Sequence, residues 1–129
     1  MQLPDLIVSE SLRSLIKQAA EEFGYPAPSD EHIEQLIQTF STREDSCLFF
    51  TEHGFLAGFI TTGHILLPNI KTALEVAWYV HPEHRNKMEG GRLYKMFEEW
   101  AKENEAVYLF QGIKTRDSKK VSEIHLRKL

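Results

Sequence analysis

The chain has 129 residues, of which 42% are hydrophobic and 26% are charged, and its formal net charge is −4. This length suits one domain with a sizeable core, and the acidic balance gives no support to binding of nucleic acid or of an anionic membrane. No apolar run reaches the ~20 residues that span a bilayer, and the N-terminus lacks the basic and apolar regions of a signal peptide. Because Cys47 is the single cysteine, an intramolecular disulfide is excluded and a cytoplasmic location is expected.

Two amphipathic helices are predicted in the segment 9–41. In residues 9–23 the apolar side chains recur three or four positions apart, and Gly24 ends the helix. The second helix begins at Ser29 or Asp30, both of which are good N-cap residues, and it repeats the same spacing. Both helices are expected to pack against the core.

The segment 46–80 differs in character and is predicted to form three antiparallel strands. Short apolar and β-branched runs are separated by turn residues such as Gly54 and the pair Pro68–Asn69. Gly58 and Gly63 lie inside the second run, where glycine indicates a bulge or the close approach of another backbone. We expect these strands at residues 47–51, at 56–67, and from 70 or 73 to 80.

The segment 81–111 begins with a polar loop that leads into an amphipathic helix. The loop carries basic residues and ends at Gly90 and Gly91. The start of a helix presents free backbone N–H groups and the positive end of the helix dipole, so this loop is predicted to hold phosphate. A strand at 106–111 follows, and because it completes a strand–helix–strand unit it is expected to lie parallel to the central strand.

The tail, residues 112–129, is predicted to be a polar loop and a short final helix, which Val121, Ile124 and Leu129 outline. No repeat or linker divides the chain. The order of elements therefore predicts a single α/β domain over residues 1–129, with a mixed sheet.

The loop and its flanks resemble a known family. Residues 80–93 read Val-His-Pro-Glu-His-Arg-Asn-Lys-Met-Glu-Gly-Gly-Arg-Leu, which resembles the GNAT superfamily of acyl-CoA-dependent N-acyltransferases. In that family a strand ending in Val-x-Pro is followed by Arg or Gln, two residues, Gly, one residue, and Gly or Ala. Met88 stands where the first glycine is expected, and the matching residues are Val80, Pro82, Arg85 and Gly90. The order of elements from about residue 45 onward agrees with the family as well.

The resemblance implies a GNAT-like acyl-CoA N-acyltransferase fold, with acetyl-CoA (coenzyme A) as co-substrate and no metal. The pyrophosphate of the coenzyme would lie over the backbone amides of residues 88–91. The pantetheine arm would pair with the main chain of residues 78–80. The coenzyme-binding residues implied in this way are Trp78, Tyr79, Val80, Arg85, Asn86, Lys87, Met88, Glu89, Gly90, Gly91 and Arg92.

The implied reaction is direct attack of a primary amine, on a small molecule or a protein, on the thioester. A Glu on the central strand often serves as the base in this family, and Glu75 lies in an otherwise apolar strand. Strand alternation predicts that Glu75 shares a face with Ala77 and Tyr79. Leu126 occupies the position of the family's usual tyrosine acid, so Tyr79 and Tyr94 are substitutes by proximity. The alternative is that Glu75 is an exposed or ion-paired residue with no catalytic role.

The resemblance also raises expectations about surfaces. The family's closing C-terminal hairpin is not expected, because the chain stops at Leu129. The strand at 106–111 would then keep an exposed edge, which favours a homodimer. The loop Gly24–Pro28 is expected to help shape the acceptor pocket. A second interpretation of the chain is a catalytically inactive domain of the same fold that binds coenzyme A or a partner protein.

The remaining reactive side chains are interpreted as structural. Cys47 is expected to be a core thiol, because no activating partner can be identified. His81 and His84 are expected to be loop or surface residues, since with His53 and His64 they show no metal-like spacing.

Overall fold

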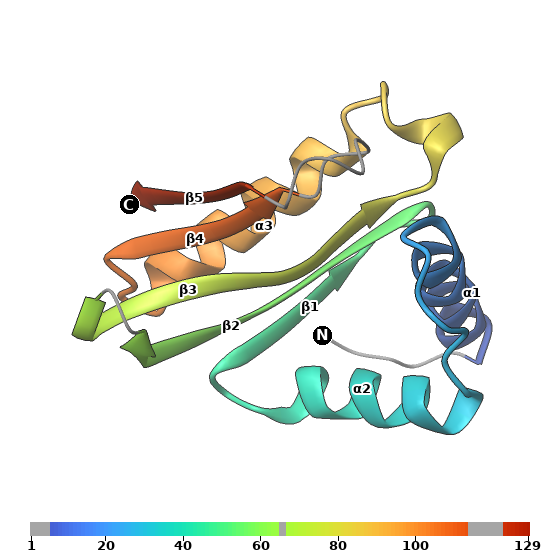
Figure 1. The fold of residues 1–129 in the computed structure, drawn as a ribbon, viewed down its shortest axis with the longest axis horizontal. Helices are drawn as coiled ribbons and strands as arrows, with labels where there is room; N and C mark the ends of the chain where they lie inside the picture. Colours follow the sequence, from blue (N-terminus) through green and yellow to red (C-terminus); the bar gives the residue numbers. More distant parts are fainter. Residues whose placement is uncertain (1–5, 65–66, 114–122) are drawn as a thin grey trace.

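The computed structural model describes residues 6–64, 67–113 and 123–129 (Figure 1). Two helices precede a meander of three strands, and a short turn, a third helix and two further strands follow. The elements are α1 (Leu6–Glu22), α2 (Asp30–Thr42), β1 (Ser46–Phe50), β2 (Gly54–His64), β3 (Leu67–Val80), a 3-10 turn (Pro82–His84), α3 (Glu89–Glu103), β4 (Tyr108–Ile113) and β5 (Glu123–Lys128). Within these residues no helix has the length and apolar character needed to cross a bilayer.

The five strands form one mixed sheet in the order β1-β2-β3-β4-β5. The pairs β1–β2, β2–β3 and β4–β5 are antiparallel, and the pair β3–β4 is parallel. The predicted antiparallel meander and the predicted parallel strand after α3 are therefore confirmed. The fold is the mixed α/β arrangement that the sequence indicates.

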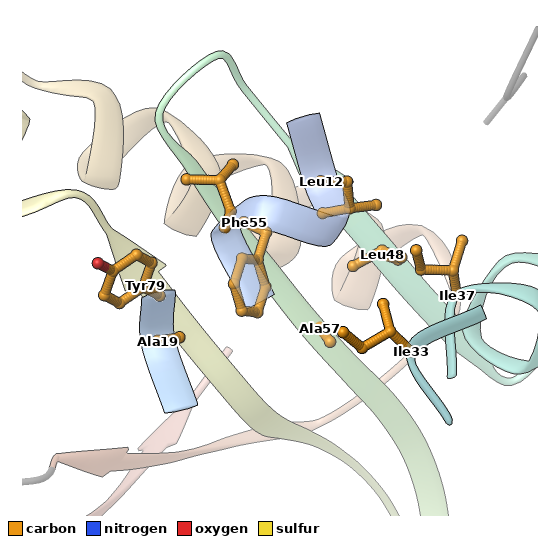
Figure 2. Close-up of a cluster of buried hydrophobic side chains, with 9 residues drawn as sticks. Leu12, Ala19, Ile33, Ile37, Leu48, Phe55, Ala57 and Tyr79 are labelled. Carbon is orange, nitrogen blue, oxygen red and sulfur yellow. The ribbon is translucent and has the colours of Figure 1, made fainter. Parts of the chain in front are cut away.

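Helices cover both faces of the sheet, and each face has its own core. On one face the side chains of α1 and α2 pack on alternate residues of β1, β2 and β3 (Figure 2). On the other face α3 packs on the intervening residues. Neighbours in sequence therefore belong to opposite cores, as Cys47 and Leu48 do. The fully buried side chains Leu12, Ile33, Leu56, Leu93, Phe97 and Leu109 come from both cores.

Gly58 lets α3 lie close to β2. A Cβ atom at this position would lie 2.5 Å from Phe97 Cε1 and 2.7 Å from the Leu74 carbonyl oxygen. The pairing of β2 with β3 also shifts register at Gly58 and again at Gly63. The prediction that these glycines mark bulges or a close approach is confirmed.

A bulge in β3 decides which face each of its side chains occupies. Gly58 pairs with Glu75, whereas the residue before Gly58 pairs with Ala77, so Val76 is an extra residue. Tyr79 belongs to the α1–α2 core and Ala77 packs against it, but Gly58 faces α3. Because directly paired residues share a face, Glu75 lies on the α3 face. The predicted common face of Glu75 with Ala77 and Tyr79 is therefore wrong.

The end of the chain differs from the prediction. Residues 123–128 form β5, an antiparallel partner of β4, so the predicted short final helix is wrong. The segment alternates polar and apolar residues, which suits a strand, and β4 offers an edge that needs a partner. Since β5 covers that edge, the reason given for a homodimer is removed. Val121 lies outside the described residues.

The junction of β2 and β3 also differs from the prediction. The turn was expected at Pro68–Asn69, but β3 already begins at Leu67 and Pro68 pairs with Gly63. Asn69 keeps a positive φ of 65° inside the strand, beside the register shift. The turn residues therefore produce an irregular strand start in place of a turn.

Candidate functional site

The parallel strands β3 and β4 stop pairing before the loop that follows β3, which is the loop predicted to hold phosphate. Their pairing covers three consecutive positions, from Thr72 with Tyr108 to Leu74 with Phe110. β3 then runs on to Val80, past the end of β4 (Figure 1). Among the described residues, the register pairs between β3 and β4 end at Leu74 with Phe110, and the end of β3 at Trp78, Tyr79 and Val80 lies beyond them. A strand edge of this kind can pair with an extended, peptide-like ligand.

Residues after β3 form a compact turn that leads into α3. The N–H of His81 donates to the His53 carbonyl oxygen at 2.8 Å, and the N–H of His84 donates to the His81 carbonyl oxygen at 2.8 Å. Pro82 begins the 3-10 turn Pro82–His84, as its fixed φ and missing N–H allow. The predicted polar loop is present, but α3 begins at Glu89, so Gly90 and Gly91 lie in its first turn and not in the loop as predicted.

Met88 caps the start of α3 in a left-handed conformation. Its φ is 60° and its ψ is −7°, and its carbonyl oxygen accepts the Arg92 N–H at 3.0 Å. The Met88 side chain makes no capping hydrogen bond and is 77% exposed. Glycine adopts this backbone freely, whereas other residues are strained in it. This strain gives a physical reason why a glycine suits the position that Met88 occupies.

The first turn of α3 lies close to the end of β3 at Gly90 and is open at Gly91. A Cβ atom at Gly90 would lie 3.3 Å from Val80 Cγ2 and 3.7 Å from Trp78 Cζ2, while at Gly91 it would meet no atom within 4 Å. The N–H groups of a first helical turn have no partner within the helix. The indole Nε1 of Trp78 is also buried without a hydrogen-bond partner among the described residues. Since buried donors normally find acceptors, a ligand oxygen at this helix start would fit both sets of donors.

Arg85 turns its side chain away from the helix start, toward α1. Its Nε donates to the Val80 carbonyl oxygen at 2.8 Å, and its guanidinium forms an ion pair with Glu22. The same guanidinium lies 5.5 Å from the centre of the Tyr79 ring. Arg85 therefore fixes the end of β3 against α1. Asn86, Lys87 and Arg92 are exposed around the loop.

The structure separates the two residues predicted to be catalytic. Tyr79 is 4% exposed and lies beside Ala19 in the α1–α2 core (Figure 2). Burial, and secondarily the Glu22 carboxylate, raise the pKa of the Tyr79 phenol, which keeps it protonated. Glu75 is half-buried on the opposite face. Tyr94 is the other candidate acid. Its ring centre lies 5.4 Å from that of Trp78, and its hydroxyl oxygen accepts a hydrogen bond from Arg127.

Four ionisable side chains meet at the turn after β3. The rings of His53 and His84 stack with centroids 3.4 Å apart and an interplanar angle of 7°. His53 Nδ1 lies 3.2 Å from Glu89 Oε1, and the His81 ring lies 5.9 Å from the His84 ring. The sequence prediction missed this cluster. The cluster could have been predicted from the antiparallel pairing of β2 with β3. Gly54 pairs with Val80, so the residues that follow this pair at the end of the ladder, His53 and His81, lie side by side.

A pocket of about 380 Å³ lies beside this turn. Its walls come from one side of α1, from the turn before β2, and from the residue after β3. Among the described residues, the loop 24–28 is not part of the lining, although it was expected to shape the acceptor pocket. The lining residues are Glu10, Ser11, Ser14, Leu15, Gln18, Glu52, His53 and His81.

Cys47 is a buried thiol in the α3 core, as predicted. Burial raises its pKa to about 12 and outweighs a backbone hydrogen bond at Gly58 that lowers it. Because the thiolate is the reactive form, Cys47 is not an activated nucleophile.

Comparison with known proteins assigns the family. The model of the acetyltransferase (GNAT) family matches residues 10–122. The chain therefore belongs to the GNAT acetyltransferase family. A sequence search of curated proteins found no match.

Solved structures show the same fold at low sequence identity. An aminoglycoside 6'-N-acetyltransferase complexed with coenzyme A superposes with a TM-score of 0.65 at 13% identity, over 92% of this chain and 62% of that one. AAC(6')-Iy, in complex with a bisubstrate analogue, gives 0.71 at 13% identity, over 88% and 78%. A GNAT family acetyltransferase from Staphylococcus aureus gives 0.65 at 20% identity, over 95% and 90%. The chain spans less than two thirds of the first of these proteins, and the likeness concerns the fold.

Proposed function

We propose that this protein is an acetyl-CoA-dependent N-acetyltransferase that moves an acetyl group to a primary amine. The main observation behind the proposal is that β3 and β4 stop pairing several residues before α3 begins. The end of β3 suits the amide-bearing pantetheine arm, and the first turn of α3 suits the pyrophosphate. Two of the similar structures, an aminoglycoside 6'-N-acetyltransferase and AAC(6')-Iy, hold coenzyme A or a coenzyme A conjugate.

Residues on three elements would hold the coenzyme. The main chain of Trp78, Tyr79 and Val80 would pair with the pantetheine arm. The backbone of residues 85–92 would surround the pyrophosphate, and the Trp78 indole would donate one further hydrogen bond. The carboxylate of Glu89 has its Oε1 atom 3.2 Å from His53 Nδ1, while its Oε2 atom is buried without a hydrogen-bond partner among the described residues. The bound thioester supplies the activated acetyl group.

The pocket beside α1 is where we place the acceptor, which is a small molecule or a protein carrying a primary amine. Its lining includes the carboxylates of Glu10 and Glu52, which favour a cationic amine. The side-chain oxygen Oε1 of Gln18 is buried there without a hydrogen-bond partner in the described chain. An amine N–H can satisfy such an acceptor.

Glu75 is the proposed base and Tyr79 is the proposed acid. Because Glu75 lies on the α3 face and the pocket lies on the α1 side, Glu75 would act through an ordered water. The base must take a proton from the attacking amine, and the leaving thiolate must gain one. The raised pKa of Tyr79 keeps its proton available at neutral pH. Because the two side chains lie on opposite faces of β3, at most one of them can touch a given reacting atom directly.

Coenzyme binding tests the first half of the proposal. Calorimetric titration of the folded protein with acetyl-CoA should show stoichiometric binding. Trp78→Phe keeps an aromatic side chain, although a smaller one, and removes the buried donor, so the affinity for acetyl-CoA should fall by about fivefold to tenfold, as expected for one lost hydrogen bond. Trp100→Phe is the matched control, since Trp100 packs on Phe97 within α3. Absence of binding by the folded wild-type protein would remove the proposal.

Thiol release across a panel of amines tests the second half. Glu75→Gln should lower kcat by about 100-fold while leaving coenzyme affinity unchanged, as for loss of a general base. Glu99→Gln, an exposed change on α3, should leave kcat unaltered.

A second candidate function is a non-catalytic coenzyme A-binding or protein-interaction module. The separation of Glu75 from Tyr79 by the β3 bulge favours it. Tight coenzyme binding without thiol release from any amine would select this function over catalysis.

A further inference from the structure

The 3-10 turn after β3 gathers ligands of the kind that metals use. One ligand atom from each of His81, Glu83 and His84 can be chosen so that all three lie within 4.8 Å of one another. They come from a single turn, so the backbone that positions one of them positions the others. His81 and His84 are partly buried and Glu83 is exposed.

The neighbours of this turn restrict the motion of its imidazoles. The His84 ring is stacked on His53, which is itself tied to the Glu89 carboxylate at 3.2 Å. The His81 backbone N–H donates to the His53 carbonyl oxygen, which fixes the backbone of the turn. Restraints on the backbone and on the His84 ring lower the entropy that these groups lose on binding an ion.

The chemistry of the donors selects the class of ion. Two imidazoles and one carboxylate suit zinc, cobalt or nickel, whereas magnesium and calcium require oxygen donors. We propose that His81, Glu83 and His84 bind one divalent transition-metal ion of the zinc class. His81 also lines the pocket of about 380 Å³, so water can complete the coordination from that side.

Binding of the ion requires one existing hydrogen bond of the His81 ring to break or rearrange. The Glu83 N–H donates to His81 Nδ1 at 3.3 Å, which leaves the proton on Nε2. A metal bound at Nδ1 displaces this bond, and a metal bound at Nε2 requires the proton to move to Nδ1. The bond is longer than the usual ~2.9–3.0 Å for N–H···O contacts, so it is a weak competitor. The ion would share the His81 wall of the pocket proposed for the acceptor, and no catalytic step is assigned to it.

Cobalt absorption and zinc calorimetry test the site directly, on untagged protein without coenzyme. Addition of Co²⁺ should produce a visible d–d band, and Zn²⁺ should remove it and bind with a stoichiometry of about one. His84→Gln and Glu83→Gln should each weaken Zn²⁺ binding by about tenfold or more. Glu83 is exposed, so its variant remains folded even if the His84 variant does not.

His32→Gln is the matched control, because His32 is exposed on α2, away from the turn. It should bind Zn²⁺ as the wild-type protein does. Equal affinity for Zn²⁺ in Glu83→Gln and wild-type protein, or a loss of binding in His32→Gln alone, would overturn the proposal. Binding with Mg²⁺ preferred over Zn²⁺ would overturn it as well. None of these outcomes depends on whether the protein is an acetyltransferase.

Discussion

Replacement of Met88 by glycine should stabilise the protein, although it removes a large side chain. Met88 has a φ of 60°, and this left-handed backbone costs a non-glycine residue about 1–2 kcal/mol. Glycine relieves that strain but loses more backbone freedom on folding, by about 0.5–1 kcal/mol. The side chain is 77% exposed, so its removal sacrifices little burial. The free energy of unfolding should therefore rise by about 0.5–1 kcal/mol.

Equilibrium urea denaturation followed by circular dichroism measures this change. A gain of this size raises Tm by about 2–4 °C in a domain of this length. Met96→Gly is the matched control, since Met96 lies within α3 in regular helical backbone and is 40% exposed. That change should destabilise the protein by about 1 kcal/mol or more, because glycine is a poor helix former. Equal destabilisation by both substitutions would refute the argument from backbone strain.

Two further predictions concern other residues of the fold. Gly58→Ala should destabilise the protein by about 2–3 kcal/mol, because the new Cβ would overlap Phe97 and the Leu74 carbonyl. Gly91→Ala, with no atom within 4 Å, should instead be neutral or stabilising; similar denaturation midpoints for both would contradict this packing. The pKa of Cys47 is raised to about 12 in the fold from a usual 9.0, so the unfolded thiol ionises first and stability should fall as pH rises from about 9 to 12. Cys47→Ala should show a shallower fall over that range in urea denaturation, and an identical slope would argue against a buried thiol.

The elements that local periodicity defines were predictable from the sequence. α1 and α2 repeat apolar residues at helical spacing, and their bounds differ from the expected ones by only a few residues at either end. The loop and α3 followed from Pro82, the glycines and the amphipathic run after them. Each of these signals lies within a short segment, so no knowledge of distant contacts was needed.

Features set by contacts between distant segments were not predictable in the same way. The bulge at Val76 exists only relative to β2, and it reverses the face on which Glu75 lies. The segment 123–128 is short enough to suit either a helix or a strand, and the edge of β4 decides between them. The His53–His84 stack joins residues from two turns. The candidate site therefore depends on register as much as on its sequence pattern.

Arg85 connects the pocket beside α1 with the loop that precedes α3. Its guanidinium contacts Glu22, the last residue of α1, and its Nε holds the final carbonyl of β3. A ligand that shifts α1 from the pocket side would strain this ion pair and, through it, the loop that precedes α3. Under the proposed function, occupancy of one substrate site thus changes affinity at the other, and this linkage is reciprocal. Initial-rate kinetics should then show that each substrate changes the dissociation constant of the other by the same factor, and Glu22→Gln should bring that factor closer to one.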